Sequence, residues 1–307
     1  MSIFDNLRDW LLRPLMDNAT RERITFIENN RNYRRGVQPD TMKVRLGRGN
    51  DNVTLNLVGL AVNRSVSLLF GNGVEFDMEG EGETPEQVYI DKMYELNRKE
   101  ILLHKVAVNG AEAGTAYIKT QPDQLEKDGV WYPRLVAILP ETVTIHTDPE
   151  DMEIITGYTI EFWYKGADDK EVGRKQVMTK TYDTTEPDDE DNVDVTAEYW
   201  TVEDYEYSAK TGNKWELTGS VKWPYAFPPM IHTQNLPACD MAYGEADITP
   251  DVIALQNKIN YNASNEGKII KHHAHPKTLL FGSGTRKRVD DSVDEMWILP
   301  AGSDAKN

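Results

Sequence analysis

The chain has almost no cysteine and few histidines, which limits the metal and redox chemistry that it can carry. Among its 307 residues, one is cysteine and six are histidine. The lone Cys239 excludes an internal disulfide and leaves no C-x-x-C pattern for metal or redox work, which fits a reducing compartment. Because its neighbours Ala238 and Asp240 supply no positive charge that would activate the thiol, we interpret Cys239 as an inert side chain.

Long hydrophobic runs are also missing. No stretch approaches the roughly 18 uninterrupted apolar residues of a membrane-spanning helix. The N-terminal sequence MSIFDNLRDWLLRPL is interrupted by Asp5, Arg8, Asp9 and Arg13, which a secretory signal peptide would not tolerate. The sequence therefore predicts a soluble protein with no membrane partner, which stays in the cytoplasm where it is made.

Common catalytic motifs are absent as well. There is no G-x-x-x-x-G-K-[ST], G-x-G-x-x-G, H-E-x-x-H or G-x-S-x-G sequence, so nucleotide, zinc and acyl-transfer sites have no anchor. His272, His273 and His275 lie within four positions, but neighbouring helical residues point about 100° apart and cannot share one ion. Contact between copies of the chain would be the only route to a shared metal. We therefore predict that the protein is not an enzyme and that it binds no metal and no cofactor.

Positive charge is scarce overall, with 34 basic residues against 51 acidic ones and a net charge of −17. This balance argues against a protein that grips nucleic acid by broad phosphate neutralisation. The segment from Met1 to Arg48 differs, with ten basic and six acidic side chains; we favour a solvated helical face there over a partner surface. At the other extreme, Asp183–Asp194 has seven acidic and no basic residues but lacks EF-hand spacing, which predicts an exposed hairpin tip rather than a calcium site.

Apolar periodicity predicts mainly helical structure over residues 1–130. The expected helices are two within 1–35 and one each over 53–70, near 85–97 and near 98–110. The most apolar of them, over 53–70, should be core, with Leu57, Ala61 and Leu68 on its buried face and Gly71 as its stop.

The pattern changes to short β-strands over residues 131–235. Strand character begins at Ala116–Lys119 and recurs over 130–139, 141–147, 155–164, 175–182, 195–202, 205–208 and 214–219. Turn signals separate these runs at Asp168–Asp169 and Lys210–Asn213. The alternation of strands and turns predicts a twisted antiparallel sheet.

A long polar helix is predicted over residues 250–274. Thr249 is a good N-cap, Pro250 suits the first helical position, and Pro276 ends the run. One narrow face is apolar, formed by Val252, Leu255, Ile259, Ala263 and Ile270. The opposite face carries Asn257, Tyr261, Ser264, Lys268, Lys271 and His275. Four asparagines and a glycine lower its helix propensity, so neighbours must hold this helix, and copies of itself are plausible neighbours.

Three segments, in the order in which they occur along the chain, resemble the portal, or head-to-tail connector, proteins of tailed bacteriophages. Residues 32–36, NYRRG, are similar to that family's Y-Y-x-G segment, and residues 63–76, NRSVSLLFGNGVEF, to its helix ending in an L-F-G-N-x-V turn. Tyr243, Gly244, Glu245, Ala246 and Asp247 stand where the family has a Y-G-x-S-D turn that launches its stem helix. The resemblance covers most of the chain.

The resemblance implies an α+β, portal-like fold. It divides into a helical N-terminal and wing region over 1–130, an antiparallel β wing region over 131–235, a stem helix over 236–276 and the beginning of an α/β clip over 277–307. Family members continue into a second stem helix, a tunnel loop and a crown. None of these is found before Asn307, so we expect the chain to be an N-terminal portion of a portal.

The resemblance also implies a structural, non-enzymatic function. Family members form a dodecameric ring at one capsid vertex, through which double-stranded DNA passes non-specifically during packaging and ejection. Implied partners are further copies of the chain, terminase, the major capsid and scaffolding proteins, and a head-tail adaptor. The implied location is the virion, with the host cytoplasm during assembly. An acidic channel wall with a few placed cations would let DNA slide without sticking.

Expected roles for individual residues follow from that resemblance. The candidate channel-facing residues of the stem are Asn257, Ser264, Lys268 and Lys271. The candidate residues for packing between subunits are Val252, Leu255, Ile259 and Ile270, and the alternative exchanges these two faces. The basic group Arg286, Lys287 and Arg288 is a candidate clip contact for terminase.

Two other classes of protein stay open at this point. The many carboxylates and the Trp- and Tyr-rich strands would suit an acidic, β-rich carbohydrate-active enzyme, although nothing fixes two carboxylates at a defined separation. The second alternative is another minor phage head protein.

Overall fold

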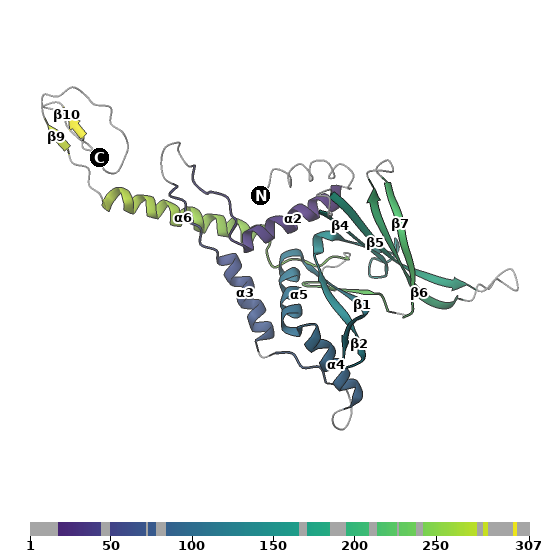
Figure 1. Ribbon diagram of the computed structural model, residues 1–307. Helices are drawn as coiled ribbons and strands as arrows, with labels where there is room; N and C mark the ends of the chain where they lie inside the picture. Colours follow the sequence, from purple (N-terminus) through teal and green to yellow (C-terminus); the bar gives the residue numbers. More distant parts are fainter. Residues whose placement is uncertain are drawn as a thin grey trace. The chain divides into compact units, whose positions relative to one another are not determined.

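The structure is a computed structural model that describes residues 18–43, 50–71, 73–77, 84–165, 171–184, 195–208, 214–225, 227–237, 242–274, 279–281 and 297–299. Figure 1 shows its helices and strands. The helices are α2 (Asn18–Arg34), α3 (Leu57–Phe70), α4 (Pro85–Leu96), α5 (Lys99–Ala113) and α6 (Pro250–Ala274). A short 3₁₀ turn, η2, spans Pro140–Thr142.

The chain folds into two compact units. The first, here called the sheet unit, comprises Met1–Arg35 and Gly59–Thr249. The second, here called the α6 unit, comprises Gly36–Val58 and Pro250–Asn307. A stretch near the N-terminus therefore belongs with α6 rather than with the residues that surround it in sequence. The division expected between residues 130 and 131 falls inside a β-hairpin.

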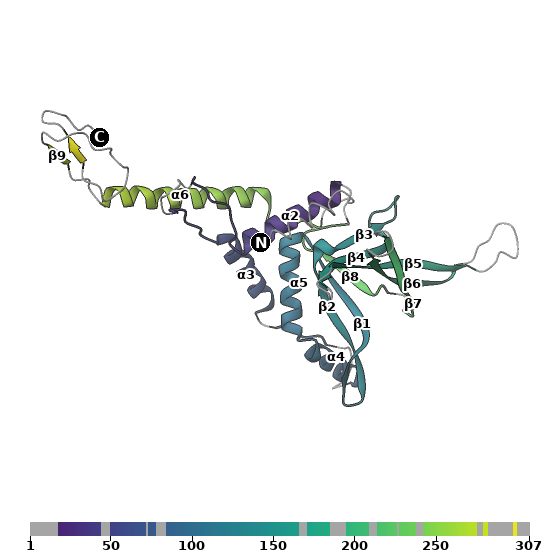
Figure 2. The same ribbon diagram turned by 45° about the horizontal axis from the view of Figure 1, so that its top comes forward.

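The smaller sheet of the sheet unit has the strand order β2-β1-β8, all antiparallel. Its strands are β1 (Thr115–Lys127), β2 (Val130–Ile138) and β8 (Met230–Gln234). Asp128 and Gly129 join β1 to β2, both with positive φ (54° and 80°), as a type I′ hairpin turn requires. The helix α5 lies against β1 and β2 (Figure 2). Asn97, just before α5, covers the edge strand β2: it accepts from Leu135 N and donates to Pro133 O, at 2.8 and 2.9 Å.

The larger sheet is a five-stranded antiparallel meander in the order β3-β4-β5-β6-β7. Its strands are β3 (Val143–Thr147), β4 (Ile155–Lys165), β5 (Glu171–Thr184), β6 (Val195–Ser208) and β7 (Lys214–Trp223). Strand alternation turns one set of side chains inward, and these form the core with β1 and β8. The buried core residues are Tyr117, Val143, Ile145, Tyr158, Ile160, Met178, Trp200, Trp223 and Met230. The predicted antiparallel strands are thus confirmed, except that the runs 195–202 and 205–208 form one strand, β6, and that the strands divide between two sheets.

Most predicted helices are confirmed, and one predicted helix face is wrong. α6 begins at Pro250 and ends at Ala274, as expected. In α3, Leu57 and Leu68 are exposed, at 43% and 76%, and Ala61 is exposed too. The buried side chains are instead Val58, Val62 and Val66, one helical turn apart. In a helix that is apolar nearly all round, periodicity does not reveal which face is covered.

The α6 unit contains α6, the described parts of residues 36–58, and two short strands. β9 (Leu279–Phe281) and β10 (Trp297–Leu299) pair in parallel. Residues 53–56 have no regular secondary structure of their own. Side chains of α6 make hydrogen bonds to the backbone of Val53 and Leu55 in this segment.

Candidate functional site

The turn at residues 243–248 is fixed to the junction of α5 and β1. Gly244 N donates to Thr115 Oγ1 at 3.1 Å, and Asp247 N donates to Ala111 O at 3.0 Å. Ile248 is 1% exposed, which anchors the end of the turn in the sheet unit. The chain therefore leaves a rigid support immediately before Pro250, where α6 begins.

Two glycines let the turn approach α5 closely. Gly114, with φ of 78°, ends α5 in the left-handed conformation that glycine adopts at least cost. A Cβ on Gly114 would lie 2.0 Å from Gly244 O, and a Cβ on Gly244 would lie 2.5 Å from Gly114 O. Both contacts are with backbone, so no side-chain movement could relieve them. The turn requires glycine at both positions.

Side chains hold the turn from two sides. Tyr243 Oη accepts from Ile145 N at 3.1 Å, and the guanidinium of Arg23 lies 4.5 Å from the centre of the Tyr243 ring. On the other side, Asn235 Nδ2 donates to Asp247 Oδ1 at 2.8 Å. The tyrosine and the aspartate of the turn are therefore both used to position it.

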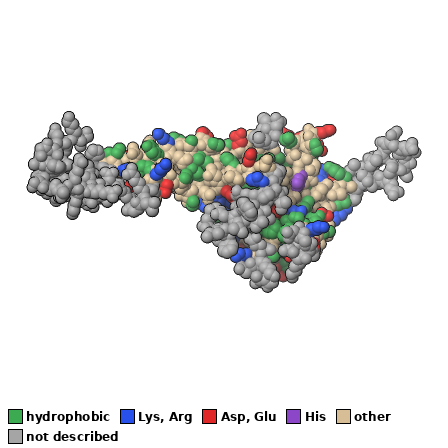
Figure 3. All heavy atoms as spheres, turned by 90° about the horizontal axis from the view of Figure 1, so that it is seen from above, with side chains coloured by type: hydrophobic (Ala, Val, Ile, Leu, Met, Phe, Trp, Pro, Cys, Tyr) green, Lys and Arg blue, Asp and Glu red, His purple; other side chains and the backbone are tan. Residues whose placement is uncertain are grey.

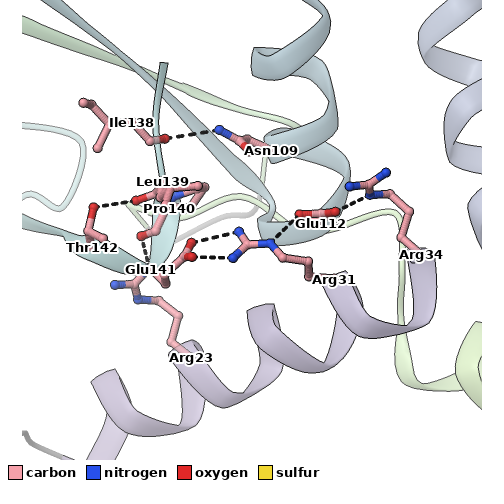
Figure 4. Close-up of polar contacts among 10 residues, drawn as sticks. All are labelled: Arg23, Arg31, Arg34, Asn109, Glu112, Ile138, Leu139, Pro140, Glu141 and Thr142. Carbon is pink, nitrogen blue, oxygen red and sulfur yellow. Dashed lines mark hydrogen bonds and ion pairs between the residues drawn. The ribbon is translucent and has the colours of Figure 1, made fainter. Parts of the chain in front are cut away.

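Three arginines of α2 tie that helix to the same support (Figure 4). Arg31 and Arg34 both donate to the carboxylate of Glu112, whose side chain is 2% exposed. Arg31 also binds both oxygens of Glu141, the Nη2–Oε2 distance being 2.9 Å. Arg23 donates to the carbonyls of the η2 region at 2.7 and 3.1 Å.

The charges in this network stabilise one another. Hydrogen bonds to Glu141 raise the pKa of Arg31, although burial acts against this. Burial alone would raise the pKa of Glu141, but the hydrogen bond and charge of Arg31 lower it overall. Both groups are therefore ionised in the folded protein at neutral pH, and each depends on the other.

A line of polar side chains is buried along α6. Gln256, Asn260 and Ser264 are 2%, 1% and 0% exposed, and they are spaced four residues apart on one face of the helix. We call these three residues the polar seam. Burial of such groups is costly unless each one is hydrogen-bonded, and here they are.

The polar seam bonds to the backbone of residues 53–58. Val53 N donates to Ser264 Oγ at 2.8 Å, and Leu55 N donates to Asn260 Oδ1 at 3.0 Å. Four residues of helix rise about 6 Å, and two residues of extended chain span about 6.6 Å. Side chains four apart on α6 can therefore meet alternate residues of an extended segment running alongside, in the opposite direction.

Gln256 completes the seam. Its Nε2 donates to Leu55 O at 2.6 Å and to Asn260 Oδ1 at 2.9 Å, and its Oε1 accepts from Val58 N at 3.3 Å. Asn260 Nδ2 donates to Gln38 Oε1 at 2.5 Å. The side chains of α6 therefore bond to backbone groups of this segment that a neighbouring strand would bond to in a sheet.

Apolar side chains lie on the outside of the same unit. Leu255 is 63% exposed and Ile270 is 58% exposed, and Figure 3 shows hydrophobic side chains at the surface along this part of the molecule. The other large apolar residues exposed here are Val37, Val53, Leu55, Leu57, Tyr261 and Ile269. Among its described residues, the α6 unit therefore buries a line of polar side chains and exposes several large apolar ones, which is unusual for a folded unit.

Comparison with known families decides the class. The family described as phage portal protein, SPP1 Gp6-like, matches residues 13–266. The chain belongs to this portal family. Among curated protein sequences, none matches the chain. Portal proteins are structural components of the phage particle rather than enzymes, which displaces the carbohydrate-active alternative.

The three landmarks of the portal resemblance all lie within the matched residues. NYRRG ends α2, with Tyr33 buried and Gly36 at φ of 78°. In residues 63–76, Gly73 N donates to Phe70 O at 3.0 Å as α3 ends, and the ring of Phe76 stacks on Tyr94 at 4.4 Å.

Within the described part of the portal chain, no helix is both long and apolar enough to cross a membrane.

The structure places the predicted channel-facing residues in different surroundings. Lys268 is exposed, and Asn257 is half-buried. Lys271 is exposed but forms an ion pair with Asp51 at 2.9 Å. Ser264 is fully buried in the polar seam, which corrects its expected place on an open face. Helical spacing had grouped Ser264 with the lysines, because it does not reveal a covering segment that is distant in sequence.

The predicted packing residues divide in a similar way. Leu255 and Ile270 are exposed, whereas Val252 and Ile259 are half-buried within the portal chain itself. Several further predictions lie outside the described residues. They concern Arg286, Lys287, Arg288, His275, Cys239 and the acidic segment 185–194.

Sequence reasoning missed the arginine network. The basic excess between Met1 and Arg48 was interpreted as a solvated face or a partner surface, and both readings are wrong for Arg23, Arg31 and Arg34. A usable signal was Glu112, which sits in the apolar run VAVNGAEA of α5. A carboxylate buried in such a run requires cationic partners.

Proposed function

We propose that this portal protein assembles through its α6 unit into a ring at the capsid vertex, dodecameric as the family implies. In this proposal α6 is the stem helix, and the sheet unit is the wing. Viral DNA passes through the ring when it is packaged and again when it is ejected. Terminase, the major capsid and scaffolding proteins, and a head-tail adaptor bind the ring at successive stages, in the host cytoplasm and then in the virion.

The single observation that carries this proposal is the exposed apolar surface of the α6 unit. The unit buries the hydrogen-bonded polar seam, while Leu255, Ile269 and Ile270 are left exposed. Apolar side chains gathered on one surface typically mark a protein interface. A head-to-tail contact between identical chains, repeated until it closes, gives a ring in which each copy covers these residues on the next.

The charge distribution is compatible with DNA passing without sticking. The chain has a net charge of −17, so a broad positive surface is not available to grip the phosphates. We assign weak contact with DNA to Lys268, which is exposed, and to Asn257 on the same helix. Lys271 contributes less, because Asp51 offsets its charge. The group Arg286, Lys287 and Arg288 is proposed to meet terminase on its charge alone.

Ring assembly is tested by native mass spectrometry and negative-stain imaging of the purified chain. The wild type should give closed rings, and the double variant Leu255→Gln, Ile270→Gln should give mainly monomers. Leu217→Gln is the matched control, because Leu217 is comparably exposed, at 56%, but lies on β7 of the sheet unit. Rings formed by the double variant would contradict the proposal.

The role in DNA passage needs a separate measurement. In a packaging assay with terminase, Lys268→Ala should reduce the amount of DNA packaged while rings form normally. Lys258→Ala is the control on the same helix, where the ammonium lies over the ring of Tyr261, 5.4 Å from its centre. Loss of rings in Lys268→Ala would assign this lysine to assembly instead of the channel.

A further inference from the structure

A cavity of about 380 Å³ lies in the sheet unit where α4 and α5 meet beside β2. These three elements adjoin in both ribbon views (Figures 1 and 2). The cavity is lined by Leu96, Asn97, Arg98, Ile101, Leu102, Lys105, Arg134, Leu135, Val136 and Ala137. Its volume is within the range of about 300–1,000 Å³ that is typical of small-molecule sites.

The charged residues of this cavity are all of one sign. Arg98, Lys105 and Arg134 line it, and no carboxylate of the described residues does. None of these three side chains makes a hydrogen bond or an ion pair with any other residue that the structure describes. Three cations around one cavity, with no partner in the described part of the chain, are unexpected in a protein with a net charge of −17. Arg98 and Lys105 are exposed and Arg134 is half-buried, so the three cations together give the cavity a positive surface that an anion can approach.

The arginines of α2 differ from the cations of the cavity because carboxylates lie beside them. Arg31 and Arg34 also lie close together, but Glu112 lies between them and Glu141 accepts a two-pronged hydrogen bond from Arg31. The wall of the cavity is fixed independently of its cations. Asn97 Nδ2 donates to Met93 O and Pro133 O, and Asn97 Oδ1 accepts from Leu135 N, at 2.8 to 2.9 Å. Asn97 therefore holds α4 against β2.

We propose that this cavity is a binding site for a phosphate group. Two guanidinium groups and an ammonium can together neutralise a doubly charged phosphate, and arginine forks match phosphate oxygens in geometry. A single carboxylate would leave two of the three cations unpaired. The phosphate can belong to a free compound such as pyrophosphate or to the backbone of a nucleic acid, and the two sources are distinguished below. The site does not depend on the proposed ring or on its channel.

Calorimetric titration of the intact chain with pyrophosphate at low ionic strength tests the site. The test variant is Arg98→Gly, Lys105→Gln, Arg134→Gln. Glycine suits position 98 because Arg98 has a left-handed backbone with φ of 53°, so the fold should tolerate it. Lys214→Gln, at an exposed lysine of β7, is the control for loss of charge. Thermal unfolding of each variant checks that it is folded, and Arg98→Gly alone serves if the triple variant is not.

The wild type and Lys214→Gln should bind pyrophosphate saturably and alike, and the triple variant should bind it at least roughly tenfold more weakly. Equal binding by the triple variant, or none by the wild type, would overturn the proposal. A short DNA duplex that competes with pyrophosphate would identify the source as a nucleic-acid backbone. A duplex that does not compete would identify a free phosphate compound. Tighter binding of polyglutamate than of pyrophosphate would reject phosphate in favour of an acidic peptide.

Discussion

The turn before α6 and the unit that α6 forms are adjacent in sequence, yet they are held together by opposite means. The turn depends on close backbone approach at Gly114 and Gly244 and on a buried apolar anchor, Ile248. The α6 unit depends on amide and hydroxyl side chains that bond to an extended segment. In the first region a substitution acts through the volume it adds. In the second it acts through the hydrogen bonds it removes.

This difference matters for assembly. The sheet unit has a contiguous apolar core around Tyr117 and Met178, so it carries its own stability. The α6 unit leaves Leu255, Ile269 and Ile270 exposed, so in the proposed assembly its polar seam fixes the helix before another copy binds. A seam of directional hydrogen bonds positions the segment precisely, while the apolar exterior stays available for association.

The largest effect is expected from adding a methyl group to the turn. Gly114→Ala places a Cβ 2.0 Å from a backbone oxygen and strains a residue at φ of 78°, so it should lower the free energy of unfolding by about 4 kcal/mol or more. Gly267→Ala is the matched control on α6, where nothing lies within 4 Å. It should gain about 1 kcal/mol from helix propensity. Chemical denaturation measures the free energy of unfolding of both variants. Equal changes in Gly114→Ala and Gly267→Ala would contradict the difference between the turn and α6.

Removing the central arginine of the network should come next in size. Arg31→Met keeps much of the length of the side chain but leaves Glu141 without its partner and Glu112 with one arginine, at a cost of about 3 kcal/mol. Arg64→Met, at an exposed arginine of α3, should change stability by less than about 0.5 kcal/mol. Thermal unfolding compares the two. A small loss in Arg31→Met would mean that water replaces the network readily.

A smaller and more local effect is expected in the polar seam. Asn260→Ala leaves Leu55 N without an acceptor and should weaken the α6 unit by about 2 kcal/mol. Asn262→Ala, at an exposed asparagine two positions away, should gain about 0.5 kcal/mol instead. Hydrogen exchange at Leu55 N reports this directly, because that amide should lose its protection only in Asn260→Ala. Unchanged protection would show that the seam is not what holds the segment.

Much of the fold could be predicted from the sequence because its signals are local. Thr249, Pro250 and Pro276 delimit α6 well, and alternation in the strand region predicts the antiparallel meander. The sequence marks the Tyr-Gly-Glu-Ala-Asp turn as a landmark but does not reveal why glycine is needed there. That reason is the contact with Gly114, which lies far earlier in the chain.

The rest could not be predicted because it depends on contacts that are distant in sequence. The helical wheel of α6 separates apolar from polar residues correctly, but it gives no sign that residues 53–58 cover Asn260 and Ser264. The low helix propensity of the asparagines predicts that α6 needs a neighbour, and this prediction is confirmed. The neighbour within this chain is its own N-terminal segment. Pairing of Arg31 with Glu112 is equally invisible to periodicity.

The smallest predicted effect concerns acid, and it separates the two regions by their chemistry. The pKa of Glu141 is lowered in the folded protein, so its contribution to stability is present above the unfolded value, about 4.3, and is lost as pH falls through the folded value. The polar seam has no titratable group, so its hydrogen bonds should persist. Between about pH 5 and 3, hydrogen exchange should show α2 losing about 1 kcal/mol of protection while Leu55 N keeps its own. The variant Glu141→Gln should flatten the response of α2 without changing that of Leu55. If α2 and Leu55 N lost protection together, the two units would unfold as one. The difference between their internal contacts would then not determine how the chain unfolds.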